Sequence, residues 1–101
     1  MPAYGLGGQA ALVTGAASGI GYATAAMLGR GGARVAINFL PDDPRGTEAV
    51  ERLRAQGIDA IATPGRVGVP GEEAAMVEAA AAALGRLDLL VNNAGTPGAR
   101  G

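Results

Sequence analysis

The chain reads Thr14-Gly-Ala-Ala-Ser-Gly-Ile-Gly21 directly after a short apolar run at residues 9–13. This order predicts a buried strand that turns into a helix. In open parallel sheets, ligands bind beyond the carboxyl ends of the strands, where a helix N-terminus offers free N–H groups and a positive dipole to a phosphate. Glycines, which lack Cβ atoms, let the backbone approach that phosphate. We therefore predict a nucleotide-binding turn; the alternative is a turn that uses glycine for its geometry alone.

Strand and helix patterns alternate along the rest of the chain. The predicted strands cover residues 9–13, 34–38, 58–63 and 87–92. The order β-α-β-α-β-α-β is typical of a parallel sheet with right-handed crossovers, covered on both faces. The predicted fold class is therefore α/β, a doubly wound parallel sheet. Residues 1–101 are expected to form one partial domain, truncated after the fourth strand.

The first predicted helix carries apolar residues at the spacing of one helical face. This spacing predicts that the stripe packs on the sheet. The stripe consists of Ile20, Ala23, Thr24, Met27 and Leu28.

Capping residues predict the ends of the next two helices. Asp43 is a good N-cap and Pro44 suits the first helical position, so the second helix is expected to begin there. A loop at residues 64–71 leads to the third helix, whose first turn contains Glu72. An acid in that position favours the positive end of the helix dipole. Gly85 ends the helix.

Composition excludes several classes of function. The 101 residues contain no Cys, His, Lys or Trp. This excludes a disulfide framework, a Cys/His metal site, a Schiff-base lysine and a lysine-dependent phosphate loop. Eight arginines balance nine acids, so we predict no nucleic-acid partner. No charged leader or long apolar segment is visible, so we predict no membrane partner, and we expect a cytoplasmic location.

Two motifs give the chain a resemblance to the classical short-chain dehydrogenases/reductases, which have a Rossmann fold. The family's cofactor loop, Thr-Gly-x-x-x-Gly-Ile-Gly, is matched from Thr14 to Gly21. Its Asn-Asn-Ala-Gly motif is matched from Asn92 to Gly95, after the fourth predicted strand. The resemblance covers residues 9–95. It implies an NAD(P)-dependent oxidoreductase that transfers a hydride between nicotinamide and a carbonyl or alcohol substrate.

The resemblance also implies which residues bind the cofactor. Those of the first motif would hold the diphosphate and the adenosine ribose: Gly15, Ser18, Gly19, Ile20 and Gly21. Those of the second motif would line the cofactor and brace the central strands: Asn92, Ala94 and Gly95. Asn93 is interpreted equally well as a structural amide that ties neighbouring loops together.

The end of the second predicted strand bears on the choice between NAD and NADP. An acid there binds the ribose hydroxyls of NAD, whereas a basic residue accommodates the 2′-phosphate of NADP. Asn38 and Phe39 stand at these cofactor-binding positions, and the missing acid favours NADP slightly. Ser18 counts against this, because relatives that prefer NADP often have a basic residue in its place.

Charged residues just beyond this strand have two interpretations each. Asp42 and Asp43 are interpreted as helix-capping acids rather than ribose ligands. Arg45 could reach a 2′-phosphate, but we interpret it as a solvated surface side chain. After the third strand, Val67 is expected to pack on the adenine, while Arg66 either stacks on it or points to solvent.

The family's proton-transfer residues do not occur in this chain. They include a Tyr-x-x-x-Lys pair and an upstream Ser beyond the fourth strand, and the sequence has no Lys. Its single Ser, Ser18, lies in the cofactor loop. We therefore assign no catalytic residue and expect the chain to be the N-terminal cofactor-binding half of a dehydrogenase, inactive alone. The alternatives are a non-catalytic dinucleotide-binding module and a gene remnant.

In a doubly wound sheet the fourth strand is internal. Here it would form an apolar edge at residues 87–91, open to self-association.

Overall fold

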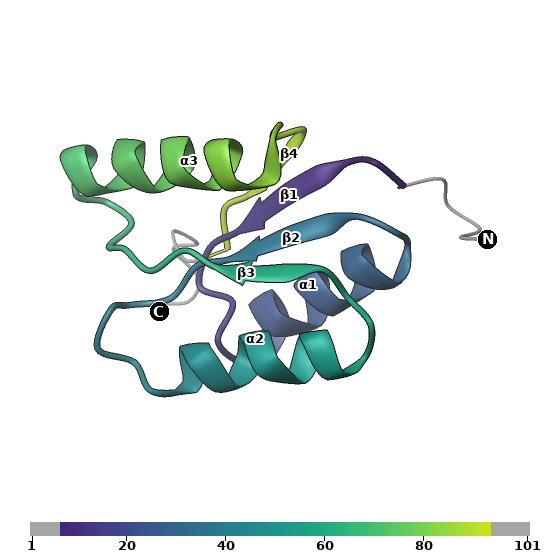
Figure 1. Cartoon of the computed structure of the whole chain (residues 1–101). Helices are drawn as coiled ribbons and strands as arrows, with labels where there is room; N and C mark the ends of the chain where they lie inside the picture. The colour runs from purple at the N-terminus through teal and green to yellow at the C-terminus, as the bar shows by residue number, and fades with distance from the viewer. Residues whose placement is uncertain (1–6, 94–101) are drawn as a thin grey trace.

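The computed structural model describes residues 7–93, which form a four-stranded parallel sheet between two layers of helices (Figure 1). The spatial order of the strands is β3-β2-β1-β4. This confirms the predicted α/β class and the doubly wound parallel arrangement. The elements in chain order are β1 (Ala10–Val13), α1 (Gly19–Arg30), β2 (Arg34–Ile37), α2 (Arg45–Ala55), β3 (Ala60–Ala62), α3 (Pro70–Leu84) and β4 (Leu89–Val91).

Side-chain alternation along β1 supplies two separate cores. Ala11 and Val13 face α1 and α2, whereas Ala10 and Leu12 face α3. Figure 1 shows α1 and α2 on one side of the sheet and α3 on the other. All four β1 residues are fully buried because successive strand residues point to opposite, covered faces. β1 is therefore the central element, and the loop that follows it begins inside the fold.

The predicted inward face of α1 is wrong for Ile20 and Met27, although Leu28 of the same stripe does pack, partly buried, against the core. Ile20 and Met27 are 77% and 61% exposed, while the residues buried along this helix are Gly21, Ala25 and Ala26. The physical reason is close approach: small side chains let the helix backbone lie against the sheet and the glycine-rich loop. Periodicity alone favoured the large apolar residues.

The helix ends also differ slightly from those predicted. α2 begins at Arg45, one residue beyond Pro44, although the Asp43 carboxylate still accepts a hydrogen bond from the Arg45 backbone N–H at 3.0 Å. α3 begins at Pro70, inside the stretch predicted as loop, because proline at the first helical position sacrifices no hydrogen bond. Gly85 ends α3 with a φ of 85°, as its position predicted.

β4 lies at the end of the described sheet and pairs there with β1. Leu89 and Leu90 are 37% and 53% exposed, so this strand is the least covered of the four. None of the helices within residues 7–93 combines the length and the apolarity needed to cross a bilayer.

Asp88 fastens β4 to β1. Its carboxylate accepts hydrogen bonds from the Ala10 backbone N–H at 2.9 Å and from the Arg86 guanidinium at 2.8 Å. The Asp88 backbone N–H donates to the Ala10 carbonyl at 2.8 Å. The guanidinium first, and then the Ala10 N–H, hold the pKa of Asp88 below its ordinary value.

Asp88→Asn should therefore be less stable than the wild type at neutral pH and less sensitive to acid. Because the folded-state pKa is lowered, the carboxylate's stabilisation is present above its ordinary pKa and disappears as the pH falls through the lowered value. Urea unfolding between neutral and strongly acidic pH measures this. Asp42→Asn is the control for loss of one negative charge, and identical acid dependence in all three proteins would refute the role of Asp88.

Candidate functional site

The loop after β1 requires glycine at two positions. Gly15 and Gly19 have φ angles of 61° and 62°, in the left-handed region that glycine adopts without strain. Between them Ser18 is extended and precedes the first residue of α1, but its side chain makes no capping hydrogen bond to that helix. The first turn of α1, with its free amide groups, therefore opens at the carboxyl end of the central strand.

The buried side-chain amide of Asn38 connects the loop after β1, the loop after β3 and α3. Its side-chain oxygen accepts from the Gly15 N–H at 3.1 Å. Its side-chain nitrogen donates to the carbonyls of Thr63 and Gly65 at 3.1 and 3.2 Å and contacts the sulfur of Met76 at 2.7 Å. The residue is only 2% exposed. Its amide therefore fixes the loop after β1 relative to the loop after β3.

Asn93 ties the end of β4 to the same turn. Its side-chain nitrogen donates to the Gly15 carbonyl at 3.1 Å, which confirms the structural interpretation of this residue. Gly21 packs against both groups, because a Cβ atom there would lie 2.3 Å from the Gly15 oxygen and 2.8 Å from the Asn93 side-chain nitrogen. Gly21 thus serves helix packing.

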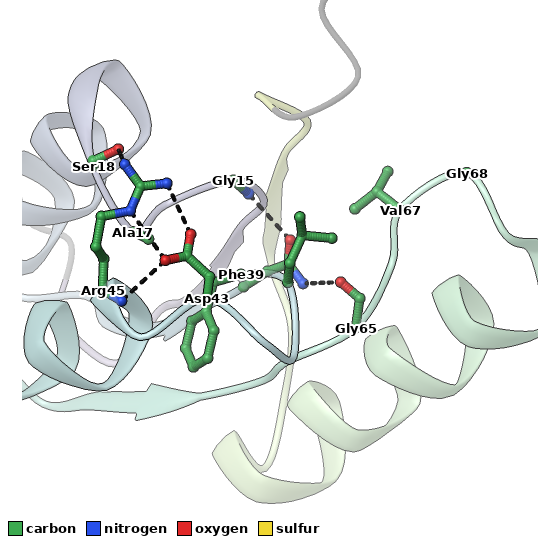
Figure 2. Close-up of a pocket in the computed structure, with 11 residues that line it drawn as sticks. Gly15, Ala17, Ser18, Phe39, Asp43, Arg45, Gly65, Val67 and Gly68 are labelled. Carbon is green, nitrogen blue, oxygen red and sulfur yellow. Dashed lines mark hydrogen bonds and ion pairs between the residues drawn. The ribbon is translucent and has the colours of Figure 1, made fainter.

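A hollow of about 420 Å³ lies beyond the carboxyl ends of β1 and β2. Figure 2 shows the side chains that line it. Its volume falls within the range of small-molecule and cofactor sites. Its wall combines backbone of glycine-rich loops with apolar side chains and one ion pair. The lining residues are Gly15, Ala17, Ser18, Asn38, Phe39, Leu40, Asp43, Arg45, Gly65, Val67 and Gly68.

The hollow brings together some of the residues that the sequence predicted to bind the cofactor. It is lined by five of the predicted residues: Gly15, Ser18, Asn38, Phe39 and Val67. Four others lie outside this lining: Gly19, Ile20, Gly21 and Asn92. Asn92 is exposed, and its side-chain oxygen lies 3.3 Å from the Thr14 hydroxyl, which donates to it. Ala94 and Gly95 lie outside the described residues.

An ion pair that the sequence did not place in the site lies at its rim. The Arg45 guanidinium donates to both Asp43 carboxylate oxygens, at 3.0 and 2.9 Å, and to the Ser18 hydroxyl at 3.2 Å. Figure 2 shows it between these two residues. The hydrogen bonds from Arg45 lower the pKa of Asp43 and, in return, raise the pKa of Arg45. Both groups are therefore charged at neutral pH.

Arg66 and Val67, in the loop after β3, lie in different surroundings. Val67 lines the hollow, whereas Arg66 is exposed and lies 3.7 Å from Glu72 in an ion pair. Arg66 thus points to the first turn of α3 and is not among the residues that line the hollow. On the opposite wall, Phe39 packs so closely on α2 that a Cβ atom at Gly46 would lie 2.1 Å from its ring.

The arrangement suits a ligand with an apolar ring system and anionic groups. Phe39, Leu40 and Val67 offer apolar surface, the turn at Gly15 leads to the N-terminus of α1, and Arg45 supplies a cation. Within residues 7–93, no cluster of acidic side chains has the composition of a metal site.

Comparison with known proteins gives consistent matches. A family model described as short chain dehydrogenase matches residues 9–101. Versicolorin reductase 1 from Aspergillus parasiticus is 41% identical over 90 residues, which are 89% of this chain and 34% of that protein.

Solved structures match in the same way. A short chain dehydrogenase from Burkholderia cenocepacia in complex with NADP gives a TM-score of 0.82 at 42% identity, over 90% of this chain and 37% of that one. A short chain dehydrogenase/reductase from Burkholderia phymatum in complex with NAD gives a TM-score of 0.79 at 30% identity, over 84% of this chain and 30% of that one. The chain thus spans about a third of the length of the proteins that it matches.

Proposed function

Because the chain belongs to the short-chain dehydrogenase family, we propose that its hollow binds the adenosine and diphosphate parts of an NAD(P) dinucleotide. The observation that carries this is the Gly15–Gly19 turn, which Asn38 and Asn93 hold at the carboxyl end of β1 beside the hollow. A phosphate placed there meets the free amides and the positive dipole of α1. The Burkholderia relatives carry NADP and NAD, which supports this ligand class.

Individual residues have distinct parts in this proposal. Val67 and Phe39 pack against the adenosine, and Gly15 and Ser18 lie beside the sugar and the diphosphate. Gly19 and Ile20 contribute backbone N–H groups of the first turn of α1, which explains a binding role for Ile20 despite its exposed side chain. Asn92, Ala94 and Gly95 are proposed to extend the site toward the nicotinamide on the family resemblance.

We further propose a preference for NADP, oxidoreductase activity of the family type and a cytoplasmic location for the protein to which this sequence belongs. Residues 1–101 would form the cofactor-binding part of its Rossmann domain and would not transfer hydride alone, because the proton-donating Tyr-x-x-x-Lys pair of the family has no counterpart in them. The alternative of a non-catalytic dinucleotide-binding module remains.

Calorimetric titration of the folded chain with NADPH and NADH tests the binding proposal. We expect saturable binding of both with one site per chain, and no oxidation of NADPH when cyclohexanone or ethyl acetoacetate is added. A folded chain that binds neither nucleotide would refute the proposal, and a chain that does not fold alone would favour a truncated dehydrogenase or a gene remnant over an independent dinucleotide-binding module. Turnover of either ketone would refute the assignment of no catalytic residue.

Within residues 7–93, no strand pairs with the outer edge of β4, and this supports a second proposal, self-association of two copies. Leu89 and Leu90 are exposed, and no charged residue occurs within β4 to discourage edge pairing. A second copy presents the same edge, so two copies can pair about a two-fold axis. Light scattering should give a dimer for the wild type and a monomer for Leu90→Lys, and a monomeric wild type would refute this proposal.

A further inference from the structure

We propose that Arg45 recognises the 2′-phosphate of NADP(H), and that Asp43 and Ser18 hold its guanidinium in position to do so. This inference rests on the proposed dinucleotide function and names the group that decides between its two forms. It reverses the interpretation of Arg45 as a solvated surface side chain.

Arg45 occupies a suitable position beside the hollow. It is the first residue of α2 and lies at the rim of the hollow, next to the segment that follows β2. It is the only basic residue among those that line the hollow in the described part of the chain. A 2′-phosphate on an adenosine bound there would bring two negative charges to this wall, and Arg45 is the group that can meet them.

The guanidinium of Arg45 is already oriented by its neighbours. Asp43 binds it through two hydrogen bonds, to Nε and to Nη2, and also accepts from the Arg45 backbone N–H. Nη1 donates to the Ser18 hydroxyl across the hollow's rim, so the side chain bridges the loop after β1 and the start of α2. A planar guanidinium fixed in this way loses little further freedom when a phosphate binds.

The Arg45 guanidinium also keeps N–H donors for a ligand. A guanidinium has five N–H groups, and the hydrogen bonds of the described residues use three of them. One N–H on each terminal nitrogen is left to donate to a phosphate. Ser18 accepts from Arg45 and keeps its own O–H as a third donor.

The exposure of the two side chains indicates whether Arg45 or Asp43 contacts the ribose end of the ligand. The Arg45 side chain is 63% exposed, whereas that of Asp43 is 15% exposed and has both oxygens bonded to Arg45. The ligand therefore meets the guanidinium first. Asp43 is therefore assigned as a positioning residue, because both of its carboxylate oxygens accept hydrogen bonds from Arg45.

Titration of the folded wild type and of Arg45→Gln with NADPH and NADH tests the inference. In the wild type we expect NADPH to bind more tightly than NADH. Arg45→Gln should weaken NADPH binding at least about 10-fold, the size of a lost charge-assisted hydrogen bond, and change NADH binding less than about twofold. Arg45→Lys, which keeps the charge without the planar fork, should fall between the two.

Arg52→Gln is the matched control, because Arg52 is an exposed arginine on the same helix that lies over the ring of Tyr22. It should leave both affinities unchanged. Equal losses for NADPH and NADH in Arg45→Gln, no loss in either, or tighter NADH binding by the wild type would overturn the inference while the dinucleotide function stands. A folded wild type that binds neither nucleotide would instead refute the proposed function itself.

Discussion

Replacement of Asn38 with alanine is expected to lower the free energy of unfolding by about 3 kcal/mol, because it leaves several buried polar groups without partners. The side-chain amide of Asn38 accepts a hydrogen bond from the Gly15 N–H and donates to the carbonyls of Thr63 and Gly65. Asn38 is 2% exposed. Each such group costs about 1–3 kcal/mol when it is buried and unsatisfied. Urea unfolding followed by circular dichroism measures the loss.

A second variant separates this hydrogen-bond role from simple loss of volume. Asn38→Asp keeps the shape and the acceptor for Gly15 but places an oxygen against two carbonyl oxygens, so it should be at least as unstable as Asn38→Ala at neutral pH. Gln56→Ala, which removes an exposed amide at the end of α2, is the control and should cost less than about 1 kcal/mol. An Asn38→Asp protein as stable as the wild type would show that the amide nitrogen holds no loop.

Gly21→Ala should be the most damaging of the glycine substitutions in α1, with a loss of about 2–3 kcal/mol. The added Cβ would lie 2.3 Å from the Gly15 carbonyl oxygen, a backbone atom that the hydrogen bond from Asn93 holds in place. The helix must then move away from β1, which distorts the turn as well as the packing. The same substitution should therefore weaken NADPH binding together with stability.

Gly71→Ala provides the matched control for Gly21→Ala. Gly71 lies in the first turn of α3, and a Cβ atom there meets nothing within 4 Å. The higher helix propensity of alanine should make this variant as stable as the wild type, or more stable by up to about 1 kcal/mol. Urea unfolding that ranks the two variants equally would contradict the packing role of Gly21.

The sequence allowed the order and the parallel arrangement of the elements to be predicted, because strand runs, turn glycines and helix caps act locally. Val13, Gly15 and Gly85 illustrate this: one lies in a buried apolar strand, and the other two adopt left-handed φ angles of 61° and 85° where a strand or helix ends. For Asn93 the sequence left two interpretations open, a ligand contact and a structural tie between loops, and the hydrogen bond to the Gly15 carbonyl supports the second.

Two features could not be read from pattern alone. The face of α1 depends on how closely its backbone approaches Gly15, and hydrophobic spacing favoured Ile20 and Met27 over the small residues that allow that approach. The pairing of Arg45 with Ser18 joins residues 27 positions apart, and it arises only when the loop after β1 and the start of α2 meet at one end of the sheet. Each residue taken separately is an ordinary polar surface group.

Locating the bound nucleotide on the chain tests directly whether the hollow is the dinucleotide site. Amide resonances of the labelled wild-type protein should be followed by NMR during titration with NADPH. We predict saturable shifts at Gly15, Ser18 and Val67, with none at Gly32 and Gly57, which follow the C-terminal ends of α1 and α2. Shifts confined to β4, or no saturable shift in a folded protein, would contradict the assignment of the hollow as the dinucleotide site.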